Sequence, residues 1–357
     1  CGFEATEHLP PDVMHDVHEG VILFIMRHVI SHLITSDFFT LKTLNLCILN
    51  FNYAPCDAKN KPEQISNEYL KGKSNIRGSA SQVFCFFRHF SMYVGEHVPC
   101  ENEVWRLYVL LRKVVDIVMS RKVPKKHVHY LQRLIHFLCL DFQTLFPAAS
   151  VPCKLHYLTH YPSYILKYGP LINLWAMRFE SKHQYFKDVA RKVRNFKNIA
   201  RTLALRHQYL ETYIATQVSS ENIVTTGCRP ILFEHLPEIV RSHIVDCGLA
   251  RDNVVVLKSL AIDGFVYSQG CAIVQSVSED DHPQFAQVCE LFCVNRGIVV
   301  LAYVLDTIEF DEHFHLYTVN VTTECVVLTN LHHFQNEPLF VKKKMNKHVI
   351  NPRHGLF

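Results

Sequence analysis

The sequence lacks the cysteine spacings that mark metal or redox sites. It contains 13 cysteines, an odd number, and none of them forms a CxxC pair; the closest spacing is the CxxxC of Cys289 and Cys293. Structural zinc sites and redox dithiols use closely spaced pairs, and secreted disulfide frameworks usually contain an even number of cysteines. We therefore expect reduced, mostly buried thiols in an intracellular protein of the nucleus or cytoplasm.

Long apolar runs and several enzyme motifs are also missing. The best candidate for a membrane span, residues 21–34, is shorter than the roughly 18 residues required and contains Arg27, His28 and His32. The first residues lack the order of a signal peptide, and no GxSxG motif occurs. The GKS at residues 72–74 lacks the first glycine of a P-loop. The sequence thus predicts no membrane contact, no nucleophile elbow and no phosphate-binding loop.

The composition is that of a folded protein with two or three domains. Apolar residues make up 48% and charged residues 20% of the 357 positions. Helical periodicity covers residues 12–50, 80–146 and 154–216, whereas short β-rich runs separated by polar turns begin at residue 254. We therefore expect a helical part followed by a β-rich part, with a boundary near residues 217–230.

The stretch from residue 174 to residue 206 combines an apolar stripe with a basic face. At helical spacing, one stripe contains Phe179, Phe186, Val189, Val193, Phe196, Ala200 and Leu203. We expect this stripe to pack on a core. The opposite face begins with Glu180, and eight Lys or Arg against one acid lie between Lys182 and Arg206.

This basic face has two interpretations. Charge runs usually form a solvated face, with Glu180 paired to a neighbouring Lys187 or His183. The alternative is a carboxylate directed at a phosphodiester, with cations that follow a DNA backbone. The DNA-binding candidates are Lys182, Lys187, Arg191, Arg194, Lys197 and Arg201.

A second informative stretch, LPPDVMHDVHEGV, places Asp12 directly before a predicted helix. Asp is a favoured residue immediately before a helix, so capping alone could account for it. His15 and His18 could join Asp12 around zinc, but the HExxH pattern starting at His18 fails at Ile22. A single carboxylate cannot hold a hard divalent cation, so Asp12 and Glu180 would each need partners.

Together, PPDVMHDVHEGV and KLHYLTHYPSYILKYGPLINLWAMRFESKHQYFK resemble the second half of the catalytic domain of CACTA-type (En/Spm) DNA transposases, in a divergent form found in animal genomes. The family's Asp-x-x-His motif matches Asp12 to His15, and its last carboxylate, a Glu shortly after a Trp, matches Trp175 and Glu180. SASQVFCFFRHFSMYVGEHVP is similar to the family's helical insertion. The resemblance covers roughly residues 5–215.

The resemblance implies an α/β RNase H-like fold with a large all-α insertion, followed by a small β-barrel-like domain. Residues 1–20 would belong to the catalytic core with its second acidic motif, 21–150 to the insertion, 151–226 to the end of the core, and 227–357 to a β-rich module with an unknown partner. Asp12 and Glu180 would be catalytic ligands of Mg²⁺ or Mn²⁺, and His15 would orient or assist Asp12.

One departure limits this assignment. The family's first Asp precedes the Asp-x-x-His motif, and no Asp occurs among the eleven residues before Asp12. We therefore expect a fragment that is inactive alone, from a protein that cuts and joins DNA in its full-length form. The alternatives are a domesticated, non-catalytic DNA- or chromatin-binding protein and a helical scaffold with an appended barrel. The sequence leaves self-association open.

Overall fold

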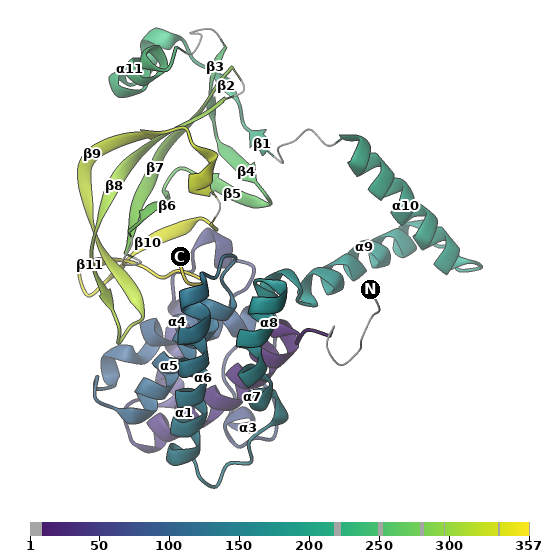
Figure 1. Cartoon of the computed structure of the whole chain (residues 1–357), viewed down its shortest axis with the longest axis vertical. Coiled ribbons are helices and arrows are strands. Elements are labelled where there is room, and N and C mark those ends of the chain that lie inside the picture. Colours follow the sequence, from purple (N-terminus) through teal and green to yellow (C-terminus); the bar gives the residue numbers. More distant parts are fainter. Residues whose placement is uncertain are drawn as a thin grey trace.

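The computed structural model describes residues 9–217, 223–248, 253–278, 282–295, 297–334 and 336–356. Figure 1 shows three parts: a helical body, a pair of helices that projects from it to the right, and a β-rich part above it in this view. Helices occupy the described residues up to Gln217, and the first strand begins at Ile223. The expected change from helices to strands near residues 217–230 is confirmed.

The helical body is built around one apolar helix. A π-helix, η1 (Met14–Val21), continues into α1 (Ile22–Thr35), which is surrounded by α3 (Asn67–Leu70), α4 (Ala80–Val94) and α5 (Glu103–Val118). The outer helices are α2 (Leu41–Asn50), α6 (Lys125–Leu145), α7 (Cys153–Tyr157) and α8 (Tyr161–Tyr168). Short 3₁₀ turns are η2 (Pro55–Asp57), η3 (Gly95–His97), η4 (Leu158–His160) and η5 (Leu171–Asn173).

The segment Met14–Thr35 has the length and mean hydropathy, 1.3, of a membrane-crossing helix. However, 56% of its most apolar stretch of 18 residues is buried inside the protein. Its apolar side chains, such as Ile25, Met26 and Ile30, are fully covered by neighbouring helices. A helix that is apolar on most sides is expected at the centre of a helical body. The packing therefore accounts for its composition.

The basic segment departs from the prediction in two ways. It forms two helices, α9 (Met177–Val193) and α10 (Ile199–Gln217), because Arg194 adopts a left-handed conformation with φ 51° and ends α9. The expected core stripe is also wrong: α9 has no buried residue, and Phe179 and Phe196 are 70% and 67% exposed. Instead, the ring of Phe186 stacks on that of His207 from α10, at 5.5 Å. The apolar side chains thus join two helices to each other.

The β-rich part contains a closed, antiparallel six-stranded barrel. Its strands are β6 (Cys271–Val277), β7 (Pro283–Val294), β8 (Gly297–Asp311), β9 (Leu316–Leu328), β10 (Leu339–Lys344) and β11 (Lys347–Ile350). The pairing order β7-β6-β10-β11-β9-β8 is closed by a β7–β8 ladder that runs from Phe285 opposite Leu305 to Val294 opposite Gly297. Closure satisfies the hydrogen-bonding edges that an open sheet would expose.

Smaller elements extend the barrel at one end. β2 (Arg229–Pro230) and β3 (Val254–Leu257) continue its sheet beside β7, and β1 (Ile223–Thr226), β4 (Ser259–Ile262) and β5 (Phe265–Ser268) form a separate three-stranded sheet. The helix α11 (Glu238–Asp246) contributes Val240 and Ile244 to a small core with β3 and β7. Two 3₁₀ turns, η6 (Phe233–His235) and η7 (Leu331–Phe334), complete this part.

The barrel is joined to the helical body through buried polar contacts. At the β8–β9 turn, the carbonyl oxygen of His313 accepts a hydrogen bond from Trp105 Nε1 at 3.1 Å, and Phe314 packs against Gly95. A Cβ at position 95 would lie 2.7 Å from the Phe314 ring, so glycine permits this close approach. The turn at residues 311–315 is therefore a docking element.

The described residues between 9 and 217 contain helices and no strand. An RNase H-like core depends on a sheet, and the antiparallel sheets of this structure lie in the barrel part. The RNase H-like assignment therefore stays a prediction. The large all-α region that it expects between the two acidic motifs corresponds to the helical body.

Candidate functional site

Asp12 is held in place by three hydrogen bonds. Its Oδ1 accepts from the backbone N–H groups of Met14, at 3.1 Å, and Ala176, at 2.9 Å, while Oδ2 contacts the Nδ1 of His15. The bond from Met14 is the helix-start contact expected of an Asp in this position. The bond from Ala176 is different in kind, because it ties the start of η1 to the residue directly before α9.

Glu180 reaches the same imidazole from the other side. Its Oε1 lies 3.5 Å from His15 Nε2, so the two ring nitrogens of His15 face the carboxylates of Asp12 and Glu180. The structure thus brings together three residues that the sequence singled out, although they come from opposite ends of the helical region. The pairing of Glu180 with Lys187 or His183 is absent among the described contacts, and His15 takes that place.

A third carboxylate, Glu19, was missed by sequence reasoning. Its Oε2 lies 3.9 Å from His15 Nε2, one turn further along η1. An acid four residues after a histidine on a predicted helix was the available signal, because such residues face the same side. Asp12, Glu19 and Glu180 therefore surround one imidazole on the accessible side of η1.

The charges of this cluster are mutually dependent. Burial tends to raise the pKa of Asp12, but the hydrogen bonds from Ala176 and His15 outweigh it and lower that pKa. The hydrogen bond to Asp12 raises the pKa of His15, and the nearby Glu19 and Glu180 carboxylates raise it further. The arrangement favours a positive charge placed among three carboxylates.

His18 does not join this cluster. It points to the buried side of η1, where its ring stacks on Phe84 at 4.8 Å and meets Trp175 edge to face at 5.9 Å. Burial lowers the pKa of His18 to about 4. The alternative of a zinc site formed by Asp12, His15 and His18 is therefore wrong, because the two histidines lie on different sides of the helix.

The basic residues lie on the projecting pair α9–α10, which we call the hairpin. Lys182 pairs with Glu211 of α10 at 3.1 Å, and Arg191 pairs with Asp188 at 3.4 Å. The remaining candidates are exposed and form no ion pair with any described residue: Lys187, Arg194, Lys197 and Arg201. Lys182 therefore helps to join the hairpin, and the four unpaired cations face solvent.

A buried group near the barrel has the composition of a metal site but a different role. Asp57, Cys85 and His89 place their ligand atoms within 4.8 Å of one another. However, Asp57 already contacts the guanidinium groups of Arg88 and Arg353. Burial raises the pKa of Cys85 to about 12, so its thiol stays protonated. A cation would meet two positive charges and a neutral thiol, so this is an ion-pair cluster that holds the barrel.

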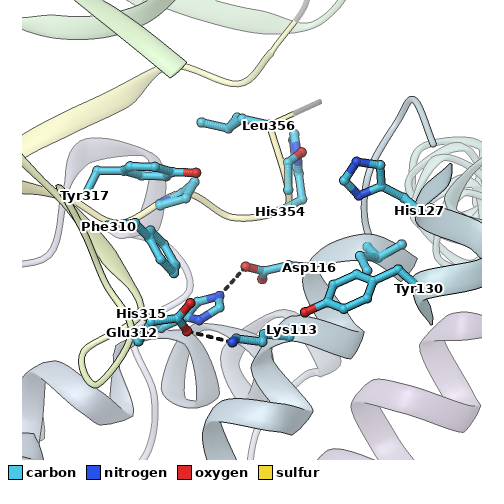
Figure 2. Close-up of a pocket in the computed structure, with 13 residues that line it drawn as sticks. Lys113, Asp116, His127, Tyr130, Phe310, Glu312, His315, Tyr317, His354 and Leu356 are labelled. Atoms are coloured by element: carbon cyan, nitrogen blue, oxygen red, sulfur yellow. Dashed lines mark hydrogen bonds and ion pairs between the residues drawn. The ribbon is translucent and has the colours of Figure 1, made fainter. Parts of the chain in front are cut away.

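Figure 2 shows a pocket of about 180 Å³ where α5 meets the β8–β9 turn. Asp116 Oδ2 contacts His315 Nε2 at 2.6 Å, and Lys113 Nζ contacts Glu312 Oε2 at 2.7 Å. Both pairs join the helical body to the barrel. The principal charged groups of this pocket are thus engaged in docking the two parts to each other.

Comparison with known proteins yields no match: no family model, no curated protein and no solved structure resembles the chain significantly. The geometry of the Asp12–His15–Glu180 cluster and the charge of the hairpin are the features of the chain that bear on its function.

Proposed function

We propose that this chain is a transposase-like DNA-binding protein, in which Asp12 and Glu180 hold a divalent cation beside the DNA path. One observation carries the proposal: two acids far apart in the sequence meet on the two sides of His15. The resemblance to CACTA-type transposases required this convergence, whereas capping by Asp12 and a solvated Glu180 did not. Metal-dependent DNA enzymes need carboxylates that converge on the reacting phosphate.

The donor atoms fit Mg²⁺ or Mn²⁺. Asp12, Glu19 and Glu180 offer carboxylate oxygens, the ligands that hard cations prefer, and their side chains are 27%, 43% and 56% exposed. The raised pKa of His15 indicates that this position favours positive charge. Asp12 Oδ2 and a Glu180 oxygen would bind the cation once His15 rotates away. A cation there would stabilise developing charge on a phosphate oxygen.

The hairpin would position DNA relative to this cluster. Glu180 lies in the first turn of α9, and the exposed cations Lys187, Arg194 and Lys197 continue from it towards the hairpin tip. A chain of phosphates bound along this surface would pass Glu180. The contacts made by such side chains fix the register of the backbone without reading sequence.

A second candidate, a non-catalytic DNA-binding protein, is favoured by a different detail. His15 occupies the space between Asp12 and Glu180 and contacts both. An imidazolium in that position satisfies the carboxylates without a metal, so the cluster could persist as a purely structural ion network. In this case the hairpin would still bind DNA, and divalent cations would have no effect on the cluster.

The salt dependence of DNA binding tests the shared part of both candidates. The logarithm of the DNA association constant falls linearly with the logarithm of the salt concentration. We expect K187A/R191A/R194A to reduce the steepness of this fall by up to about 2.7, because each phosphate contact contributes about 0.9 to the slope. The measurement is fluorescence anisotropy with a labelled duplex over a series of KCl concentrations. The matched control K42A/K59A/R133A removes the same charge from exposed positions of the helical body.

Two results decide this test. A salt dependence that becomes less steep in K187A/R191A/R194A, the hairpin variant, and not in the control supports the proposal. Equal slopes in the wild type and in the hairpin variant would remove the hairpin from any DNA path, and an equal fall in both variants would indicate a nonspecific effect of net charge.

A further inference from the structure

A cavity of about 270 Å³ lies next to the carboxylate–imidazole cluster. Its wall includes His18 of η1, Phe84 of α4, and Trp175 and Met177 at the start of α9. Ala176, between these last two residues, donates the hydrogen bond to Asp12. The cavity and the cluster therefore share a segment of backbone, and a molecule in one would lie beside the other.

The wall of this cavity combines flat apolar groups with positive charge. Arg121, Arg178 and Arg353 line it, and Glu337 is the only acid among its lining residues that the structure describes. Glu337 is already paired with Arg353 at 2.5 Å. An excess of positive charge therefore remains at Arg121 and Arg178, and a ligand with an anionic group is favoured over a cation.

Hydrogen-bonding groups in the wall lack partners. Neither ring nitrogen of His18 nor Trp175 Nε1 makes a hydrogen bond to any described residue, although all three atoms are buried. A neutral imidazole has one donor and one acceptor, and indole has one donor. Buried polar atoms without partners are uncommon in folded proteins. Asn60, Asn173 and Ser81 add further donors and acceptors to the lining.

We propose that this cavity binds one nucleotide unit, with its base against Trp175 and its phosphate towards Arg178. A nucleobase is flat and carries both donors and acceptors at its edge, and the attached phosphate provides the negative charge that the arginines favour. The unit is an unpaired nucleotide of DNA, which rests on the proposed function, since DNA on the hairpin would pass the cavity mouth. A free nucleotide presents the same chemistry.

Tryptophan fluorescence tests the site directly, because the chain has only two tryptophans. Trp105 is buried in the helical core and bonded to His313, whereas Trp175 lines the cavity. We expect deoxyadenosine monophosphate to quench the wild-type emission, and W175F to abolish the change. R178A should weaken binding of the monophosphate but not of deoxyadenosine, which has no phosphate.

Binding of two DNA duplexes distinguishes an unpaired nucleotide of DNA from a free nucleotide as the ligand. A duplex with one bulged adenine should bind about 5- to 150-fold more tightly than the same duplex with an abasic bulge, the range expected for stacking of one base. W175L should remove this preference, whereas Y209L should retain it. Tyr209 is a matched control because it is a 69% exposed aromatic residue on α10, away from the cavity.

The outcomes distinguish this inference from the proposed function. Equal affinity for the bulged and abasic duplexes, together with no quenching by the monophosphate, would overturn the nucleotide site even if DNA binds the hairpin. Quenching by the monophosphate without any DNA binding would support the site with a free nucleotide as its ligand, and would contradict the proposed function. If W175L does not fold, the site is tested by R178A alone, which should weaken binding of deoxyadenosine monophosphate but not of deoxyadenosine.

Discussion

His18 should make the stability of this protein depend on pH. It is 1% exposed, its ring stacks on Phe84, and burial lowers its pKa from 6.5 to about 4. The unfolded chain, with the ordinary pKa, binds a proton first as the pH falls. The stabilisation from neutral, buried His18 is therefore fully present above pH 6.5 and is lost as the pH falls towards 4.

The size of this effect follows from the shift. The gap between a pKa of 6.5 and one of about 4 corresponds to about 3.5 kcal/mol, at about 1.4 kcal/mol per pKa unit, and about 3 kcal/mol of this is lost by pH 4, where folded His18 is half protonated. The variant H18F retains a ring against Phe84, and the adjacent cavity of about 270 Å³ gives room for the larger side chain. We therefore expect H18F to lose about 3 kcal/mol less than the wild type between pH 7 and pH 4.

Urea unfolding followed by far-ultraviolet circular dichroism, at pH values from 7 to 4, measures this difference. At pH 7, H18F should be as stable as the wild type or more stable by about 1–3 kcal/mol, because the substitution removes two buried nitrogens without partners. Other titrating groups, including the nearby Asp12, are common to both proteins and cancel in the comparison. Parallel pH curves for the two proteins would refute a neutral, buried His18.

Three further results are expected. D57N should destabilise the protein by about 3–5 kcal/mol in thermal unfolding, because it leaves the buried Arg88 without its carboxylate; an unchanged midpoint would show that the ion-pair cluster is not buried. F179S should change stability by less than about 0.5 kcal/mol, whereas F87A should cost about 3–5 kcal/mol, since Phe179 is 70% exposed and Phe87 fully buried. The raised pKa of His15 means that its positive charge competes with Mn²⁺ for the carboxylates until the proton is lost, so Mn²⁺ affinity should rise with pH. H15A should weaken this pH dependence, and identical pH profiles in the wild type and H15A would exclude competition between the His15 proton and Mn²⁺.

Sequence patterns predicted the elements better than their packing. The helices of the body and the strands from Val254 onward follow apolar periodicity, because these segments bury one face or most of their surface. The same reasoning failed for α9. Its apolar stripe looked like a core-facing surface, but no layer of described residues buries it, and Phe186 packs on the partner helix α10 instead.

Local conformation explains the other differences. The turn that follows Arg194 contains two asparagines, Asn195 and Asn198, which was the available sequence signal, and Asn195 Oδ1 accepts a hydrogen bond from the Lys197 N–H at 3.1 Å. No sequence pattern predicted the π-helical turns of η1. These turns place His15 and Glu19 on the accessible side of the helix, while His18 is buried. Glu19 could have been found from its spacing to His15.

The candidate site was predictable in part. The pairing of Asp12 with Glu180 was inferred from a resemblance, and the structure places both carboxylates on His15. The docking of the β8–β9 turn on α5 depends on contacts between distant segments, such as Asp116 with His315, that no local pattern encodes. The cavity beside Trp175 likewise arises only when η1, α4 and the start of α9 come together.

Cation binding at the cluster tests the central claim most directly. In a titration with Mn²⁺ followed by electron paramagnetic resonance, we expect D12N and E180Q each to weaken binding at least about tenfold, a loss of about 1.4 kcal/mol, because each removes a charged ligand. The matched variant E101Q, at an exposed acid outside the cluster, should bind as the wild type does. Equal Mn²⁺ affinity in the wild type, D12N and E180Q would contradict a shared cation site.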